Sequence, residues 1–155
     1  MSISTNSAAD KAAREVRVFS EFVAKSGLQI DPASVESRAP PEPDIRCALS
    51  GDGDVAFELV EFCNAELAKD VADQRKRGTK PQFHFVEDSS EDAFLRKIAK
   101  SYQTDVPTEL LCYTGRAGVS DDVILASLRA LTNMHGLGPF RRVWFLGQTV
   151  CKIAG

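Results

Sequence analysis

Residues 43–63 read PDIRCALSGDGDVAFELVEFC. Two runs with strand-like composition, 44–49 and 55–63, flank the turn Ser50–Asp54, and the two glycines of this turn favour a tight chain reversal. The pattern therefore predicts a β-hairpin. Both alternating faces of the second run are largely apolar, which is typical of a central strand that is covered on both sides of its sheet.

Outward from the hairpin, helical and strand-like patterns alternate along the chain. We expect a helix from about Asp10 to Ser26, preceded by a flexible N-terminus at residues 1–9. The other expected elements are an edge strand near 35–38, helices at 64–77, 89–102 and from 120 onward, and strands at 82–86, 109–114, 142–146 and 149–153. This order predicts an α/β fold, in which a mixed central sheet is flanked by helices on both faces, within a single domain of residues 10–155.

Composition excludes several classes of protein. The chain has 155 residues, of which 43% are hydrophobic and 26% are charged, as in an ordinary globular domain. No run approaches the roughly 18 apolar residues of a membrane span, so we expect no membrane association. The net charge of −3 argues against strong non-specific binding to nucleic acid. The cysteines are far apart and form no zinc-binding pattern, which favours free thiols in the cytoplasm.

Two acidic residues of the hairpin carry the main functional signal. Glu58 lies in the middle of an apolar face, where an unpaired carboxylate is costly. If Asp52 is the tip of the turn, paired residue numbers sum to 104, and Arg46 lies opposite Glu58 while Asp44 lies opposite Val60. If the sum is 102, Asp44 lies directly opposite Glu58. In either register the two acids share one face of the hairpin.

This convergence leaves two interpretations open. Two carboxylates close together suit a hard cation such as Mg²⁺ or Mn²⁺, which can activate water and polarise a phosphoryl group. Alternatively, Arg46 forms an ordinary cross-strand ion pair with Glu58, and the domain has no metal site.

The residues Pro43-Asp44, then thirteen residues, then Glu58-Leu59-Val60 resemble the PD-(D/E)XK nuclease superfamily. That superfamily has a restriction-endonuclease-like fold and includes many phage and prophage proteins. The expected order of a helix, a hairpin with both acids, a helix and a strand also matches its core, over about residues 10–86. The remaining chain would be a C-terminal extension.

The resemblance implies a metal-dependent nuclease site, in which Asp44, Glu58 and the carbonyl of Leu59 are metal ligands. The superfamily's lysine, which orients the attacking water, falls at Val60 in this chain. Because valine supplies neither a charge nor a proton-transfer group, any nuclease activity is expected to be feeble.

Three further residues are candidate contributors to this site. Lys69 is the nearest lysine of the following helix, but its spacing places it opposite the inward face. Gln74 matches a glutamine that some members of the superfamily use in this helix, and it is the third predicted catalytic residue beside Asp44 and Glu58. Glu15 lies at the edge of the apolar stripe of the first helix and is predicted to be a further metal ligand.

The resulting function hypotheses are a divergent nuclease that acts on DNA or RNA, and a catalytically inactive scaffold of the same fold that binds nucleic acid or protein. Retention of both acids favours the first hypothesis, and Val60 favours the second. A homodimer through an exposed edge of the late strands is also compatible with the pattern. A phosphate-binding surface was considered from basic residues at Arg75–Arg77, Lys80, Arg96, Lys97, Lys100, Arg141 and Arg142.

Overall fold

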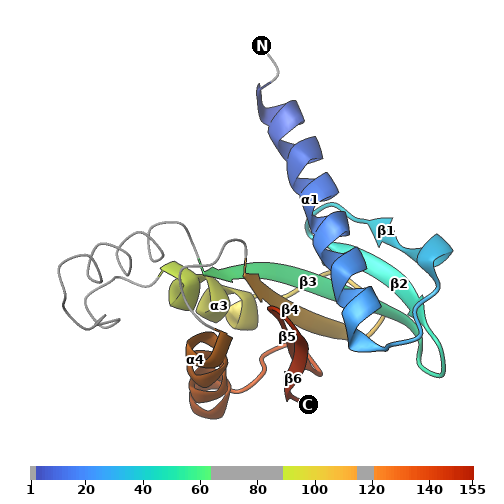
Figure 1. Ribbon diagram of the computed structural model, residues 1–155. Coiled ribbons are helices and arrows are strands. Elements are labelled where there is room, and N and C mark those ends of the chain that lie inside the picture. Colours follow the sequence, from blue (N-terminus) through green and yellow to red (C-terminus); the bar gives the residue numbers. More distant parts are fainter. Residues whose placement is uncertain (1–2, 64–88, 115–120) are drawn as a thin grey trace.

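The computed structural model describes residues 3–63, 89–114 and 121–155. These residues form one six-stranded sheet with the strand order β1-β2-β3-β4-β5-β6 (Figure 1). The neighbours β3, β4 and β5 are parallel, and the other neighbouring strands are antiparallel. The strands are β1 (Glu36–Ser37), β2 (Ile45–Leu49), β3 (Gly53–Cys63), β4 (Thr108–Thr114), β5 (Val143–Leu146) and β6 (Val150–Ala154).

Helices cover both faces of this sheet (Figure 1). The first, α1 (Ile3–Ser26), packs Phe19 and Phe22 against Phe57, with ring centroids 4.9 and 5.6 Å apart. On the opposite face, α3 (Ser89–Ala99) and α4 (Asp121–His135) enclose a second apolar core with β3, β4 and β5. The predicted α/β class, with a mixed sheet between helical layers, is therefore confirmed.

Some predicted boundaries were wrong. Helix α1 begins at Ile3, not near Asp10, and so includes residues 3–9, which we expected to be a flexible N-terminus. Alanines at positions 8, 9, 12 and 13 favour helix even where α1 projects beyond the sheet. Helix α3 ends at Ala99 instead of Tyr102, because the N–H of Lys100 bonds to the carbonyl of Lys97 and closes a tighter last turn. The predicted helix 64–77 and strand 82–86 lie outside the described residues.

The hairpin register decides between the two alternatives raised by the sequence. Ile45 pairs with Phe57 and Arg46 pairs with Ala56, so the sum is 102. The prediction that Arg46 lies opposite Glu58 was therefore wrong. The turn reverses at Gly51, one residue earlier than Asp52, and Gly51 has a φ of +88° that a side chain would disfavour.

The sequence also predicted free thiols and the absence of a membrane-spanning segment. Among the described residues Cys47, Cys112 and Cys151 are free thiols, and burial raises the pKa of Cys47 to about 12. None of the helices in the described part of the chain combines the length and the apolarity that crossing a membrane requires.

Candidate functional site

Asp44 and Glu58 meet at the end of the hairpin ladder. Asp44 lies one step beyond the last β2–β3 pair, and the 102 register places it opposite Glu58. The N–H of Asp44 donates to Glu58 Oε1 at 2.9 Å, and the N–H of Leu59 donates to Asp44 Oδ2 at 2.9 Å. Both acids are buried, with 9% and 2% of their surfaces exposed. The predicted convergence of these two carboxyl groups is therefore present.

The carbonyl of Leu59 lies at the same edge of β3. Strand β2 begins only at Ile45, which pairs with Phe57, so the part of β3 after Phe57 has no β2 residue beside it. The N–H and carbonyl of one strand residue point to the same neighbour. Since the N–H of Leu59 points to Asp44, its carbonyl also faces this side. A backbone oxygen is thus available beside the two carboxylates.

A lysine from α3 enters the site. Lys97 Nζ lies 2.7 Å from Glu58 Oε2, and the Lys97 side chain is 23% exposed. Glu58 shares its face of β3 with Val60, because alternate strand residues point to the same side, and Val60 belongs to the core covered by α3. An ammonium group therefore reaches the face on which the motif lysine is missing.

The sequence pattern places Lys97 only on a general basic surface. Its spacing contained a more specific signal, because Lys97 follows Phe94 by three residues and therefore lies on the same side of α3. Phe94 is fully buried. The contact of Lys97 with Glu58 was not predicted.

Burial and the charge of a neighbouring acid raise the pKa of both residues. Loss of solvent raises the pKa of Asp44, the nearby charge of Glu15 raises it further, and the N–H of Leu59 partly offsets this rise. Loss of solvent also raises the pKa of Glu58, as does the charge of Asp44, while Lys97 opposes the rise. The fold thus holds carboxylates at an electrostatic cost that one lysine only partly relieves.

Glu15 occupies the inward side of α1, as its predicted position at the edge of the apolar stripe implied. It is 8% exposed, and it is close enough to Asp44 to affect the pKa of that residue. Within residues 3–63, 89–114 and 121–155, however, no three His, Cys, Asp or Glu side chains are grouped closely enough to hold a metal ion together. The role of Glu15 as a metal ligand stays a prediction.

The donor set nevertheless has the chemistry that Mg²⁺ or Mn²⁺ prefers. Carboxylate and carbonyl oxygens are the usual protein ligands of hard cations. Asp44, Glu58 and Leu59 offer these oxygens at one strand edge. A cation at Glu58 would share this carboxylate with Lys97, so cation binding and the Lys97 contact are coupled.

Tyr102 adds a group that the sequence did not identify. Burial raises the pKa of its hydroxyl, and the neighbouring carboxyl groups of Glu58 and Asp44 raise it further. Neither composition nor motif spacing signals this contact, because Tyr102 follows the end of α3 and reaches the site through the packing of that helix. Gln74 and Lys69, which the sequence analysis also considered, lie outside the described residues.

A second buried acid lies elsewhere in the sheet. Glu109 of β4 is fully buried and accepts hydrogen bonds from Arg141 Nε at 2.8 Å, Arg142 Nη1 at 3.1 Å and Trp144 Nε1 at 2.6 Å. Both arginines also contact Asp52. The suggestion that Arg141 and Arg142 extend a phosphate-binding surface is therefore not favoured, because acidic partners already occupy both guanidinium groups.

Comparisons of the chain with models of known protein families, with curated proteins and with solved structures found no match. The geometry of the site is therefore the basis for a functional assignment.

Proposed function

We propose that this protein is a divergent metal-dependent nuclease with a restriction-endonuclease-like core. The observation that carries the proposal is the contact of Lys97 with Glu58, in a group that also contains Asp44 and the Leu59 carbonyl. Two acids, a backbone oxygen and a lysine form the chemical set of the PD-(D/E)XK superfamily, although Val60 occupies the usual lysine position. Lys97 would supply the same amine from a different element.

The groups have separate roles in this proposal. A divalent cation bound by Asp44, Glu58 and the Leu59 carbonyl would polarise a phosphodiester and favour ionisation of a water molecule. Lys97 would orient the attacking water and offset the negative charge that grows on the phosphate. Its partial exposure leaves the ammonium accessible to a substrate while Glu58 fixes its position.

The alternative function is an inactive scaffold that binds nucleic acid or a protein. Val60 is the observation that favours it, because this position lacks the superfamily's lysine. In that case the Lys97–Glu58 pair would serve only to compensate a buried charge. The alternatives differ in whether relocation of the lysine changes turnover.

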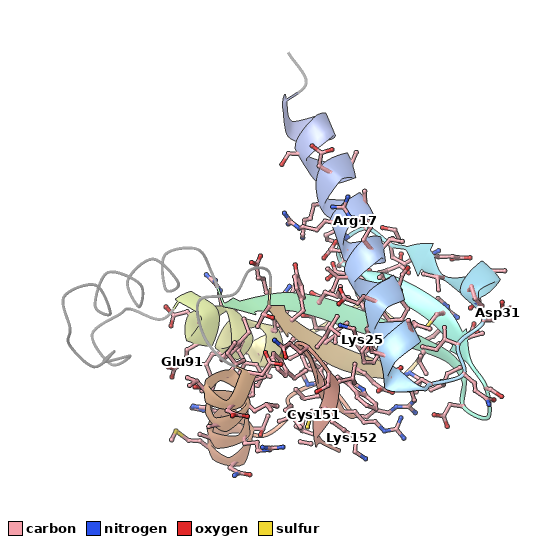
Figure 2. The ribbon with its side chains drawn as sticks, viewed as in Figure 1. Arg17, Lys25, Asp31, Glu91, Cys151 and Lys152 are labelled. Atoms are coloured by element: carbon pink, nitrogen blue, oxygen red, sulfur yellow. The ribbon has the colours of Figure 1, made fainter. Side chains whose placement is uncertain are left out.

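The deciding experiment moves the amine between the two positions. Mn²⁺-dependent cleavage of single- and double-stranded DNA and RNA would be measured for the unaltered protein and four variants. We expect the unaltered protein to cleave at least one substrate, and Lys97→Met to slow cleavage by roughly 10²–10⁴-fold. The double variant Lys97→Met/Val60→Lys should recover part of the rate. Lys25→Met, on the last turn of α1 in an exposed pair with Glu21, is the matched control and should be unchanged (Figure 2).

Cation binding separates the remaining outcomes. Calorimetric titration with Mg²⁺ should give heat that Asp44→Ala abolishes, with circular dichroism confirming that every variant is folded. Cation binding without cleavage, including by the single variant Val60→Lys, would favour the inactive scaffold. Equal Mg²⁺ binding by Asp44→Ala would refute the site assignment.

A further inference from the structure

Tyr102 carries a buried hydroxyl that has no hydrogen-bond partner. Among the described residues, it is the one buried side-chain nitrogen or oxygen atom in this condition. A buried O–H group that gives up water without gaining an acceptor destabilises the folded protein. An unpaired group of this kind therefore needs an explanation, and service to a ligand is one that its position allows.

The position of Tyr102 is set by the segment that follows α3. The next residue, Gln103, donates its N–H to the carbonyl of Pro41 at 3.1 Å. Pro41 belongs to the loop that leads into Asp44, so this bond holds the Tyr102 segment beside the loop. Five residues before Tyr102, Lys97 contacts Glu58. The tyrosine therefore lies between two fixed points of the proposed site.

Packing restricts the aromatic ring as well. The Tyr102 ring lies against Phe140, with the two centroids 5.7 Å apart, and Lys100 Nζ lies 5.2 Å from the centroid of the Tyr102 ring. A ring that is held by an aromatic neighbour and a cation keeps its hydroxyl in a defined position. Lys100 over the ring and Lys97 at Glu58 are two positive charges on the elements that carry this site, which favours an anionic ligand.

We infer that Tyr102 is a substrate-binding residue, whose hydroxyl donates to a non-bridging phosphate oxygen of a phosphodiester at the Asp44–Glu58 site. This inference rests on the proposed function and names a contact within it. Glu58 lies close enough to raise the pKa of the hydroxyl, but its oxygens already accept from the N–H of Asp44 and from Lys97. Within the described residues the hydroxyl has no acceptor at hydrogen-bond distance and angle. A tyrosine hydroxyl is protonated at neutral pH and can therefore donate to a phosphate oxygen.

The test is Tyr102→Phe, which removes only the oxygen. Binding of fluorescein-labelled DNA and RNA oligonucleotides would be followed by anisotropy in Ca²⁺, used as a cation expected to support binding without cleavage. We expect the affinity to fall about tenfold, as loss of one hydrogen bond to a charged group implies. The thermal midpoint without ligand should stay the same or rise, and Mg²⁺ binding by calorimetry should be unchanged.

Thr132→Val is the matched control for loss of a hydroxyl. Thr132 Oγ1 donates to the carbonyl of Arg129 within α4, so its removal should leave oligonucleotide affinity unchanged. If Tyr102→Phe binds the oligonucleotide as well as the unaltered protein, the inference is wrong whatever the thermal midpoint does. A fall of several degrees in that midpoint would show that the hydroxyl is paired within the protein, and this also overturns the inference.

Separate outcomes refute the Tyr102 contact and the proposed function. Mg²⁺ binding by the unaltered protein without any oligonucleotide binding would refute the phosphodiester contact and leave the cation site intact. Binding of neither Mg²⁺ nor oligonucleotide would refute the proposed function, and the role of Tyr102 would fall with it.

Discussion

Glu109 and Glu58 are both buried acids of adjacent parallel strands, yet their surroundings differ in kind. Glu109 faces α1, because it lies two residues before Leu111 and therefore shares the face of β4 that packs against this helix. Its carboxylate accepts hydrogen bonds from two guanidinium groups and an indole. Glu58 faces α3, and it receives one ammonium and one backbone N–H while Asp44 lies against it. The first carboxylate is satisfied by cations within the fold. The second belongs to a group in which negative charge is only partly compensated.

This contrast distinguishes a structural acid from a ligand-binding one. A buried carboxylate with a full set of donors ties elements together, and Glu109 joins β4 to the chain at Arg141–Trp144. Carboxylates that repel each other at a strand edge lower the stability of the fold, and such costs concentrate at functional sites. Replacement of Glu109 should therefore destabilise the fold, whereas removal of a repelled charge from the Asp44–Glu58 site should stabilise it.

The largest expected effect is the loss of stability in Glu109→Gln. The substitution leaves two arginines and the Trp144 indole without their charged acceptor, so we expect the free energy of unfolding to fall by about 3 kcal/mol. Because each arginine side chain is 32% exposed and can turn toward water, this estimate is at the low end for a broken buried pair. Urea unfolding at pH 7 measures it. Glu61→Gln, at an exposed position of β3, should change stability by no more than about 0.5 kcal/mol. Equal effects of the two substitutions on stability would show that Glu109 has no structural role.

A smaller loss is expected for Lys97→Met, about 2 kcal/mol at pH 7, because Glu58 loses its one ammonium partner. The pKa of Glu58 is already raised and should rise further in the variant. Protonated Glu58 needs no counter-charge, so the destabilisation should be full above the folded-state pKa and should disappear as the pH falls below it. Unfolding measured from pH 4 to pH 8 tests this trend. A loss of stability that does not vary with pH would show that Lys97 acts through packing. The control Lys25→Met, which breaks an exposed pair, should lower the free energy of unfolding by at most a few tenths of a kcal/mol.

The smallest effect has the opposite sign. Asp44→Asn should raise the free energy of unfolding by about 1 kcal/mol at pH 7, because the amide keeps an acceptor for Leu59 and removes a repelled charge. The pKa of Asp44 is raised in the folded protein. At a pH between the unfolded and folded pKa values, the folded protein therefore binds more protons than the unfolded chain, and its stability falls as the pH rises. The advantage of Asp44→Asn should therefore vanish in acid. Saturating Mg²⁺ should also reduce the difference in the free energy of unfolding between the two proteins, since only the unaltered protein is stabilised by binding the cation. A destabilised Asp44→Asn variant at neutral pH would mean that Asp44 is structural, like Glu109.

Much of the fold follows from local patterns. Apolar residues on both faces of 55–62 predicted a central strand, and the glycines between 50 and 54 predicted the hairpin, because backbone geometry and side-chain period are local properties. The apolar stripe of α1 and the late strands were also predicted with correct types. Boundaries were less certain, and the start of α1 was misplaced because polar residues at the N-terminus remain compatible with a helix.

The sequence by itself determined that Asp44 and Glu58 share a face of the hairpin, since a period of two leaves no other outcome in an even register. Only the tertiary structure decided which partners they meet. The turn at Gly51 selected the 102 register and separated Arg46 from Glu58, and Arg46 instead contacts Asp54 and Asp105. The packing of α3 brought Lys97 and Tyr102 to the two acids across a separation of 39 residues or more in the sequence. Contacts of this length depend on how whole elements pack against one another. Helix spacing places Lys97 on the side of Phe94, but it does not identify Glu58 as the partner.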